Sequence, residues 1–458
     1  MSDTICAIAT AKGGAIGIVR ISGPKTSEII SEACGQASLT STPRKVVFTP
    51  IKSPEGELLD EGLVTYFPSP NSYTGEDCAE ISCHGSRYVL NKVLETLIRH
   101  GARLANPGEF TQRAFLNGKL DLSQAEAVAD LIASTNHATH QMAMSQLKGH
   151  FSSELKKLRD QLLRLTSLLE LELDFSDHED LVFADRKELL QLAETIDRRI
   201  TELADSFETG QALKHGIPVA IVGKTNVGKS TLLNQLLGDE RAIVSDIHGT
   251  TRDTIEDTIE FEGIEYRFID TAGLRQTTDA IEQIGIDRAK QKIEEARIII
   301  WMLDTQPTQI EYDEMKQLLA GKEVICAHNK SDLLDKATFT PYIDHLHLIS
   351  AKQGDGIESL KKGIHEAASR LGLTGNELIV SNARHYEALL RAHESLKRVK
   401  VGLSALICQG EGESSFITTD LIAEDLRLTL AALADITGGA ITPQETLNNI
   451  FSHFCVGK

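Results

Sequence analysis

Residues 223–230 have the types and spacing of a phosphate-binding loop. They read Gly-Lys-Thr-Asn-Val-Gly-Lys-Ser, and they lie between an apolar run at 219–222 and a helix-like run at 230–237. Glycines allow a tight turn that points main-chain N–H groups at an anion, and a following helix N-terminus adds partial positive charge. In this context a chance glycine loop is the weaker interpretation. The contacts expected here are Asn226, Val227, Gly228, Lys229, Ser230 and Thr231, with Lys229 at the β- and γ-phosphates of a nucleotide and Ser230 on Mg²⁺.

A second motif, Asn329-Lys330-Ser331-Asp332, follows an apolar run at 324–327 and indicates which base is bound. The Asp332 carboxylate can accept two N–H hydrogen bonds from the guanine edge, whereas adenine offers no such pair. A site built for such a hydrogen bond rejects the analogue that lacks it by about 10⁴- to 10⁵-fold. Guanine is therefore the expected base, contacted by Asn329, Lys330 and Asp332 and backed by Ser350, Ala351 and Lys352.

Two further segments complete an ordered set of five. Residues 270–273 supply an Asp after a strand on the metal side, and residues 249–253 occupy the place of a first switch loop. Five elements in this order indicate a GTP-binding domain that resembles the translation-factor-like branch of the P-loop GTPases. The additional contacts expected from this region are Ser245, Asp246, Ile247, His248, Gly249, Thr250, Thr251, Asp270, Thr271, Ala272 and Gly273.

Composition sets limits on the rest of the chain. Its 458 residues predict two to four domains, and 41% hydrophobic residues suit a globular protein. The net charge of −19 argues against broad electrostatic binding to nucleic acid, although a local basic patch or an RNA-carrying partner stays open. No apolar run has the length of a membrane span, and the start lacks a basic and apolar leader. Seven scattered cysteines without a Cys-x-x-Cys pair favour reduced thiols, so a cytoplasmic location is expected.

The chain divides by pattern into four parts. Residues 1–118 read as mixed α/β, and 119–214 as helical, with leucines that step by three and four at 155, 158, 162, 165 and 169. Residues 215–374 alternate strands and helices, and 375–458 return to helical sequence. The expected fold is multidomain, α/β plus all-α, with a Ras-like P-loop GTPase domain inserted in a helical domain and an N-terminal α+β domain.

Taken together, the pieces resemble the MnmE (TrmE) family over the whole chain. Outside the GTPase motifs, the strongest marks are residues 20–24, 108–122 and the terminal 451–458. The resemblance implies that the N-terminal domain dimerises and binds a one-carbon tetrahydrofolate, in the 5,10-methylene or 5-formyl form. It places Arg20, Glu80, Lys119 and the terminal Lys458 at the folate. Read without the family, Arg20, Glu80 and His84 each look ordinary.

The resemblance also implies a reaction and a partner. Family members work with the flavoprotein MnmG (GidA), which holds FAD, as a heterotetramer. The pair installs an aminomethyl-type (carboxymethylaminomethyl) group at C5 of the wobble uridine of certain tRNAs. Cys455 is implied to be needed for the modification, with its chemical role open. The family commonly ends Cys-Ile-Gly-Lys, so Val456 is a mild departure.

The hydrolytic step needs a residue that orients the attacking water, and the usual residue is missing from this sequence. Ras-like domains use a Gln just after the Asp-x-x-Gly motif, but here Leu274 and Arg275 follow. The resemblance assigns the water to Glu282 and implies a potassium ion. The implied ligands are Asn226, Ser245, Ile247 and Thr250 for K⁺, and Ser230 and Thr251 for Mg²⁺. A rival hypothesis makes Arg252 or Arg275 an arginine finger.

Two other classes of function compete with an enzyme of tRNA modification. A ribosome-assembly GTPase of the Era or EngA kind would carry a basic RNA-binding module, whereas the flanks here are acidic overall. A scaffold GTPase would need neither a folate pocket nor a terminal Cys-x-Gly-Lys. Folate binding separates the first hypothesis from the other two.

Overall fold

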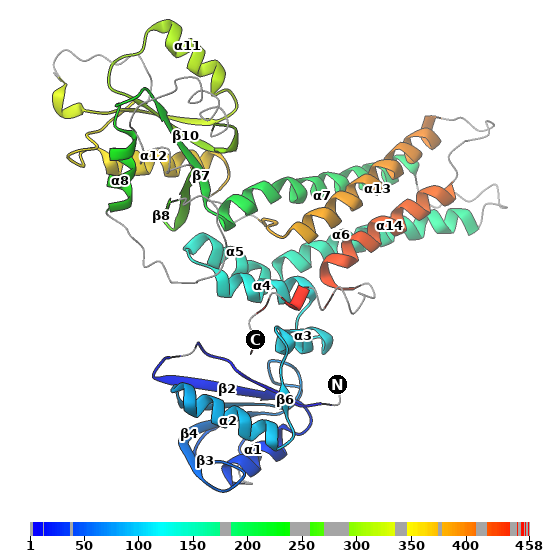
Figure 1. Ribbon diagram of the computed structural model, residues 1–458. Coiled ribbons are helices and arrows are strands. Elements are labelled where there is room, and N and C mark those ends of the chain that lie inside the picture. The colour runs from blue at the N-terminus through cyan, green and yellow to red at the C-terminus, as the bar shows by residue number, and fades with distance from the viewer. Residues whose placement is uncertain are drawn as a thin grey trace. The chain divides into compact units, whose positions relative to one another are not determined.

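The structure is a computed structural model of the 458-residue chain (Figure 1). It describes residues 3–11, 13–36, 40–174, 185–238, 257–269, 293–334, 346–373, 378–408, 419–439, 447, 450–452, 454 and 457. The chain forms two compact units. The first contains residues 1–133, 143–197 and 391–458, and the second contains residues 134–142 and 198–390. Each unit is described by itself.

The first unit begins with a six-stranded sheet of order β3-β4-β5-β2-β1-β6. Its strands are β1 (Ile5–Ile8), β2 (Ile16–Ser22), β3 (Val46–Lys52), β4 (Leu58–Phe67), β5 (Cys78–His84) and β6 (Arg103–Leu104). All neighbours are antiparallel except β1 and β6, which run parallel. The helices in this part are α1 (Thr26–Cys34), α2 (Arg87–Arg99) and α3 (Glu109–Leu116).

Alternation along β2 divides its side chains between two faces of this sheet. Val19 and Ile21 are fully buried in the core that α1 and α2 form with the sheet. Arg20 lies between them and therefore on the other face. That face is covered in part by α3, because Phe110 packs with Ile5 and Ala7 of β1.

Long helices make up the rest of the first unit. They are α4 (Leu122–Ala133), α5 (His137–Leu147), α6 (His150–Asp174), α7 (Arg186–Lys214), α13 (Ala383–Cys408) and α14 (Thr419–Thr437). Of these, α5, α7 and α13 have residues in both units. The predicted leucine stripe on α6 is confirmed, because all five leucines from 155 to 169 are at most 4% exposed. Inside the helical core, the Asp197 carboxylate is paired with His393, at 2.7 Å, and with Lys400.

The second unit contains a six-stranded sheet of order β12-β11-β10-β7-β9-β8. Its strands are β7 (Ile217–Gly223), β8 (Asp257–Phe261), β9 (Ile264–Phe268), β10 (Ile298–Leu303), β11 (Glu323–His328) and β12 (His347–Leu348). Only the β8–β9 pair is antiparallel. The helices are α8 (Lys229–Gly238), α11 (Gln309–Leu318), α12 (Ile357–Arg370) and the short 3₁₀ turn η2 (Ser331–Leu333).

Strand β10 is the centre of this second sheet. Every residue from Ile298 to Leu303 is buried, which confirms the expectation of a strand covered on both faces. One face packs against α8 and α12, and the other packs against Tyr312 and Met315 of α11. In such parallel sheets, ligands bind beyond the carboxyl ends of the strands. The residues after β7, β10 and β11 are therefore the place to look for a site.

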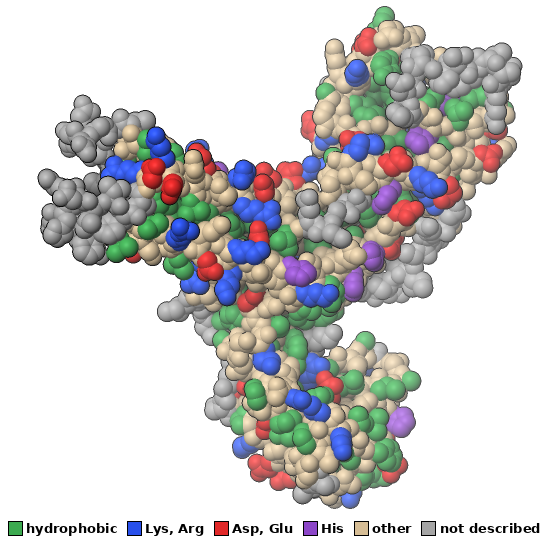
Figure 2. All heavy atoms as spheres, turned by 180° about the vertical axis from the view of Figure 1, so that it is seen from behind, with side chains coloured by type: hydrophobic (Ala, Val, Ile, Leu, Met, Phe, Trp, Pro, Cys, Tyr) green, Lys and Arg blue, Asp and Glu red, His purple; other side chains and the backbone are tan. Residues whose placement is uncertain are grey.

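The surface mixes charges of both signs. Figure 2 shows Lys and Arg side chains interspersed with Asp and Glu on the face in view. Many arginines are neutralised by neighbours, as in the pairs Arg398–Asp425 and Arg427–Glu170 on the long helices. Within the described ranges, no helix combines the length and apolar character needed to cross a membrane.

Candidate functional site

The phosphate-binding motif forms the turn between β7 and α8. Its backbone needs unusual conformations, with φ of +153° at Gly223, +61° at Asn226 and +103° at Gly228. Glycine adopts positive φ without strain, and Asn is among the few other residues that tolerate it. The ammonium group of Lys229 donates hydrogen bonds to the main-chain carbonyls of Gly223, at 2.8 Å, and Lys224, at 2.7 Å. The loop therefore curls around the lysine, as the motif requires.

The base-recognition motif is fastened to this loop by one side chain. Asn329 directly follows β11, is 5% exposed, and donates from Nδ2 to the Val227 carbonyl at 2.7 Å. Its Oδ1 accepts a hydrogen bond of 2.9 Å from the main-chain N–H of Ala351. A Cβ atom at position 228 would overlap Nδ2 of Asn329, so only glycine fits there. The three predicted segments 226–231, 329–332 and 350–352 thus meet at one edge of the sheet.

Two acidic side chains complete this edge. Asp332 accepts a hydrogen bond of 2.8 Å from the Ser350 hydroxyl, which orients the carboxylate that was predicted to read guanine. Lys330 has φ of +61° and its Nζ lies 2.7 Å from Oδ2 of Asp304, the residue after β10. The hydrogen bond from Lys330 lowers the pKa of Asp304, so this carboxylate is charged at neutral pH. The arrangement offers a carboxylate for a base edge and a main-chain cradle for phosphates.

Several predicted contacts lie outside the described residues. These are the switch and metal-side positions Ser245, Asp246, Ile247, His248, Gly249, Thr250, Thr251, Asp270, Thr271, Ala272 and Gly273, together with Glu282, Cys455 and Lys458. The described part of the motif set is the phosphate loop, the Asn329–Asp332 motif and the Ser350–Lys352 segment.

The predicted folate residues lie on the N-terminal sheet. Arg20 of β2 and Glu80 of β5 are cross-strand partners, and Glu80 Oε1 accepts from Arg20 Nε, at 3.1 Å, and from Nη2, at 2.7 Å. Arg20 Nη1 also donates to the carbonyl of Gly457, at 3.3 Å, near the end of the chain. The guanidinium carbon lies 5.4 Å from the ring centroid of Tyr73 and 5.8 Å from that of Phe110. A charged pair framed by two aromatic rings is a reasonable receptor for a flat, polar ligand.

Lys119, the third described folate candidate, lies beside the loop that carries Tyr73. Its Nζ donates to the Pro70 carbonyl at 3.1 Å, and its stem would contact a Cβ at Gly75 at 3.3 Å. Arg20, Glu80 and Lys119 are therefore linked by way of the loop between β4 and β5. His84 lies at the end of β5, where its Nδ1 is 2.8 Å from Oδ1 of Asp60 and its side chain is largely exposed.

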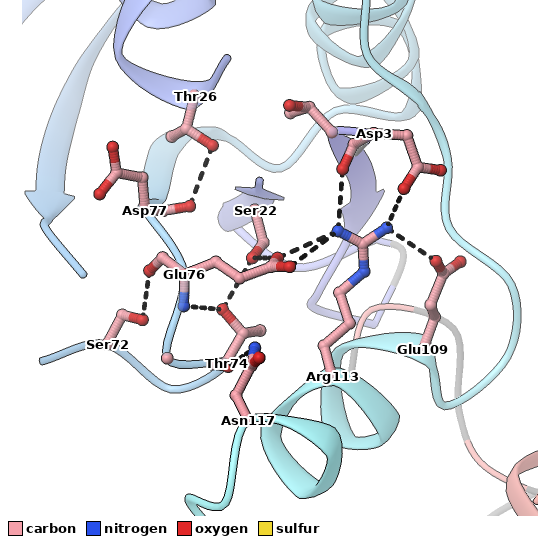
Figure 3. Close-up of polar contacts among 12 residues, drawn as sticks. Asp3, Ser22, Thr26, Ser72, Thr74, Glu76, Asp77, Glu109, Arg113 and Asn117 are labelled. Carbon is pink, nitrogen blue, oxygen red and sulfur yellow. Dashed lines mark hydrogen bonds and ion pairs between the residues drawn. The ribbon is translucent and has the colours of Figure 1, made fainter. Parts of the chain in front are cut away.

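Sequence reasoning missed the role of Arg113. The run from 108 to 122 is distinctive in the sequence, but the sequence alone suggests no function for Arg113 within it. In the structure this side chain is fully buried and contacts the carboxylates of Asp3, Glu76 and Glu109 (Figure 3). Burial alone would raise the pKa of Glu109, but hydrogen bonds from Arg103, the Asn106 N–H and Arg113 outweigh it and hold the pKa below its usual value. Only the i, i+4 spacing of Glu109 and Arg113 could have hinted at the cluster.

Four of the cysteines that the structure describes are buried thiols, and Cys326 is half-buried. Cys6, Cys34, Cys78, Cys83 and Cys326 are free. Burial raises the pKa of Cys78 to about 11 and that of Cys6 to about 12, so neither is a reactive thiolate at neutral pH.

Comparison with known proteins agrees with these motifs. A family model described as the MnmE helical domain matches residues 122–455, and one described as the GTP-binding protein TrmE N-terminus matches residues 4–119. The helical match extends to both sides of the GTPase sequence, as expected for an inserted domain.

Relatives match over the whole chain. A protein of Phocaeicola vulgatus named tRNA modification GTPase MnmE is 49% identical over 504 residues, covering 100% of this chain and 99% of the relative. Proteins of the same name from Bacteroides thetaiotaomicron and Porphyromonas gingivalis are 48% and 47% identical, again over 100% of this chain. Among solved structures, the FeoB G-domain from Methanococcus jannaschii is 26% identical with a TM-score of 0.25, covering 33% of this chain and 98% of that one. The full-length relatives and both family models show that this chain belongs to the MnmE (TrmE) family.

Proposed function

We propose that this chain is a GTPase that hydrolyses GTP to GDP and phosphate in the course of tRNA modification. The observation that carries the proposal is the link through Asn329, which joins the phosphate loop at Val227 to the base-backing segment at Ala351. A guanine reader, Asp332, lies in the same motif with its carboxylate oriented by Ser350. The relatives from Phocaeicola vulgatus and Bacteroides thetaiotaomicron are named tRNA modification GTPase MnmE, which supports the same activity.

The residues of the phosphate loop divide the work of binding. Lys229, which now donates to two loop carbonyls, would donate to the β- and γ-phosphate oxygens of GTP. Ser230 lies in the first turn of α8, whose main-chain N–H groups would also donate to phosphate oxygens. The hydroxyl oxygen of Ser230 suits Mg²⁺, with Thr251 as the expected second protein ligand. Bound there, the metal would neutralise charge between the β- and γ-phosphates.

For the hydrolytic step we propose Glu282 as the residue that orients water and K⁺ as the additional cation. The support for K⁺ comes from Asn226 of the phosphate loop, because its side-chain oxygen can serve as a ligand. The backbone of Asn226 is left-handed, with φ of +61°. Carbonyls of Ser245, Ile247 and Thr250 would complete the ion's ligands. The sequence lacks the Gln of Ras-like enzymes at the usual position, so another group has to aim the water.

For the modification itself we propose a tetrahydrofolate, in the 5,10-methylene or 5-formyl form, at Arg20, Glu80, Lys119 and Lys458. Glu80 suits the N–H donors of a pterin edge, and the cationic side chains suit folate carboxylates. The product would be an aminomethyl-type (carboxymethylaminomethyl) group at C5 of the wobble uridine of tRNA. The partner would be an FAD-containing flavoprotein of the MnmG (GidA) kind, bound by a homodimer of this chain in the cytoplasm.

We also propose the functional division of the chain. Residues 1–118 would bind folate and dimerise, and 215–374 would bind GTP. Residues 119–214 and 375–458 would form one helical domain, with Cys455 near its end. The end of one match at residue 119 and the start of the other at residue 122 support the first of these boundaries.

One reconstituted assay tests the proposal. The full-length chain, the flavoprotein, unmodified tRNA, GTP, K⁺, 5,10-methylenetetrahydrofolate as the one-carbon donor and glycine as the amine donor are combined. Wobble-uridine modification and phosphate release are followed together. Modification that requires both GTP and the folate supports the coupling, whereas modification that proceeds without GTP contradicts it. Cys455→Ser should retain phosphate release and lose modification, because position 455 is remote in sequence from every expected phosphate contact.

A further inference from the structure

The loop between β4 and β5 brings an aromatic ring to Arg20. We refer to residues 69–77 as the Tyr73 loop. Tyr73 as a residue is 37% exposed, and the centroid of its ring lies 5.4 Å from the Arg20 guanidinium carbon. Its hydroxyl is 2.8 Å from Oγ1 of Thr111 on α3. Whatever binds at Arg20 therefore meets a surface whose shape depends on this loop.

Arg113 reaches the Tyr73 loop from inside the protein. Its side chain is 0% exposed. Nη1 donates to the Asp3 carbonyl, at 2.9 Å, and to Glu76 Oε2, at 3.0 Å (Figure 3). Nη2 donates to Asp3 Oδ1, at 2.9 Å, and to Glu109 Oε1, at 3.0 Å. One planar cation thus joins the start of the chain, the Tyr73 loop and α3.

Glu76 is the residue of the Tyr73 loop that the Arg113 guanidinium binds. The same Oε2 atom accepts a hydrogen bond of 2.9 Å from the hydroxyl of Ser22, two residues after Arg20 on β2. The Ser22 hydroxyl lies 2.7 Å from that of Thr74, and Asn117 donates to the Thr74 carbonyl at 2.7 Å. Figure 3 shows these side chains converging on the loop from β2 on one side and α3 on the other. The loop is therefore held to the strand that carries Arg20.

Helix α3 makes three contacts of different kinds with this site. Phe110 places its ring against Arg20, Thr111 contacts the Tyr73 hydroxyl, and Arg113 binds Glu76. These residues span little more than one helical turn, so a displacement of α3 would shift all three contacts together. The position of the Tyr73 ring is consequently coupled to the ion pairs of Arg113.

Stability alone does not account for such a cluster. A buried ion pair often stabilises a fold no better than apolar residues of the same volume, because desolvation offsets the attraction. Removing one partner is nevertheless damaging, since the other charge is left buried without compensation. What a network of directed hydrogen bonds adds is one defined geometry, and here the geometry belongs to the loop over Arg20.

We infer that Arg113 is a positioning residue for the Arg20 site, acting through Glu76 on the Tyr73 loop. The inference rests on the proposed function only in the choice of ligand, a tetrahydrofolate. Arg113 itself is buried and does not touch that ligand. Its task is to hold the Tyr73 ring and the Arg20–Glu80 pair in the arrangement that the ligand meets.

The first experiment needs no ligand. Hydrogen exchange of the full-length chain is followed in two variants. Arg113→Lys keeps the positive charge and loses the planar guanidinium with its several N–H donors. Glu76→Gln keeps the size of the side chain and loses its negative charge. Main-chain amides of the loop, such as Ser69 and Glu76, donate to Asp77 and Thr74 side chains in the native protein. We expect them to exchange about tenfold faster in both variants, while β5 amides change little.

Val93→Ala is the matched control for this measurement. Val93 is fully buried in α2, in the core on the other face of the same sheet, and does not belong to the Arg113 network. Its truncation should speed exchange throughout the domain with no preference for the loop. If the loop amides of Arg113→Lys and Glu76→Gln show no more preference than those of Val93→Ala, Arg113 has no positioning role and the inference falls.

The second experiment measures binding of 5-formyltetrahydrofolate to the full-length chain by calorimetry. A displacement of about 1 Å at a site can lower a reaction rate about 10²-fold. We expect an effect of similar size on affinity, so Arg113→Lys and Glu76→Gln should weaken folate binding roughly 10- to 100-fold. Thr111→Val, which removes only the hydroxyl that contacts Tyr73, should lie between these variants and the wild type. Val93→Ala should bind as the wild type does.

The outcomes separate the inference from the function on which it rests. Failure of the wild-type chain to bind the folate rejects the proposed ligand, and hydrogen exchange then decides the role of Arg113 alone. Binding by the wild type with unchanged affinity in Arg113→Lys and Glu76→Gln overturns the positioning role while the folate proposal stands. Weaker binding in these variants, together with faster exchange confined to the loop, supports both.

Discussion

Asn329 donates a hydrogen bond of 2.7 Å from its side chain to the main-chain carbonyl of Val227, 102 residues earlier in the chain. The bond joins the segment proposed to read the base to the loop proposed to hold the phosphates. Both partners are buried, and neither carries the chemistry of hydrolysis. The nucleotide site therefore depends on a residue whose work is to set the distance between its two halves.

Asn329→Ala should weaken nucleotide binding. The change leaves the Val227 carbonyl and the Ala351 N–H without their side-chain partner, and an unsatisfied buried group costs about 1–3 kcal/mol. Affinity for GDP should fall about tenfold or more, because each 1.4 kcal/mol is tenfold. Titration with a fluorescent GDP analogue measures it, with Gln309→Ala on the exposed face of α11 as the control. Equal affinities in the two variants would contradict the role given to Asn329.

Gly228→Ala should abolish nucleotide binding, whereas Gly238→Ala should not. Position 228 has φ of +103°, and an added Cβ would overlap the Asn329 amide. Position 238, the last residue of α8, has open space around an added Cβ. Both proteins should remain folded by circular dichroism, since α8 keeps its packing. The same titration compares them, and retained binding in Gly228→Ala would show that the loop adopts another path.

Asp332→Asn should transfer preference from guanine to xanthine nucleotides. The Asn side chain offers a donor, which suits the 2-oxo group of xanthine and not the 2-amino group of guanine. Ser350 already orients the side chain at 332, so the new amide starts in the correct place. Competition between GDP and XDP is the measurement, with Asp313→Asn, an exposed carboxylate of α11, run alongside. Unchanged GDP preference would show that Asp332 does not read the base.

Hydrolysis should require K⁺, and K⁺ should also pair the GTPase domains of a dimer. Rates in K⁺ and in Na⁺ at equal ionic strength, with sedimentation in the presence of a transition-state analogue, are the measurements. Asn226→Gly is the informative variant, because glycine allows the φ of +61° and removes the side chain that carries the oxygen. It should lose the potassium effect and retain GDP binding.

The rival to potassium is an arginine finger, which is worth about 10³- to 10⁵-fold in kcat. Arg252→Ala, Arg275→Ala and Glu282→Ala distinguish the two mechanisms. Loss of activity in Glu282→Ala alone agrees with the potassium mechanism. Equal rates in both salts, or loss in an arginine variant while Glu282→Ala is unaffected, would reject it.

Low pH should destabilise the N-terminal sheet, because Glu109 and Asp3 then become protonated. Their pKa values are lower in the folded chain than usual, as hydrogen bonds and charges of Arg103 and Arg113 outweigh the effect of burial. Their stabilising contribution is therefore complete above the ordinary carboxyl pKa of about 4 and is lost as pH falls through the lowered values. Hydrogen exchange of β2 and β5 amides between pH 6 and pH 3, corrected for intrinsic rates, should report this loss.

Glu109→Gln tests the assignment of that acid sensitivity. The variant should be less stable at neutral pH and show a shallower loss below about pH 4, because one of the titrating groups is gone. Glu28→Gln, an exposed glutamate of α1, should keep the wild-type profile. An equally steep profile in Glu109→Gln would place the acid sensitivity elsewhere.

The sequence by itself determined the local features of the nucleotide site and the nature of the elements. The strand, loop and helix around residues 223–230 follow from glycine positions and hydrophobic runs, which act over a few residues. The unbroken apolar run of β10 and the leucine stripe of α6 likewise predicted how each element would be buried. The resemblance of the whole chain to its family was also readable in the order of short motifs.

Only the tertiary structure decided which distant residues became partners. Asn329 meets Val227 and Ala351 because parallel strands bring their carboxyl ends to one edge. The partners of Arg113 come from the chain start, a loop and its own helix, and no spacing in the sequence joins all three. The physical reason is that periodicity states which face of an element is buried, whereas the choice of partner depends on how the faces of several elements pack together.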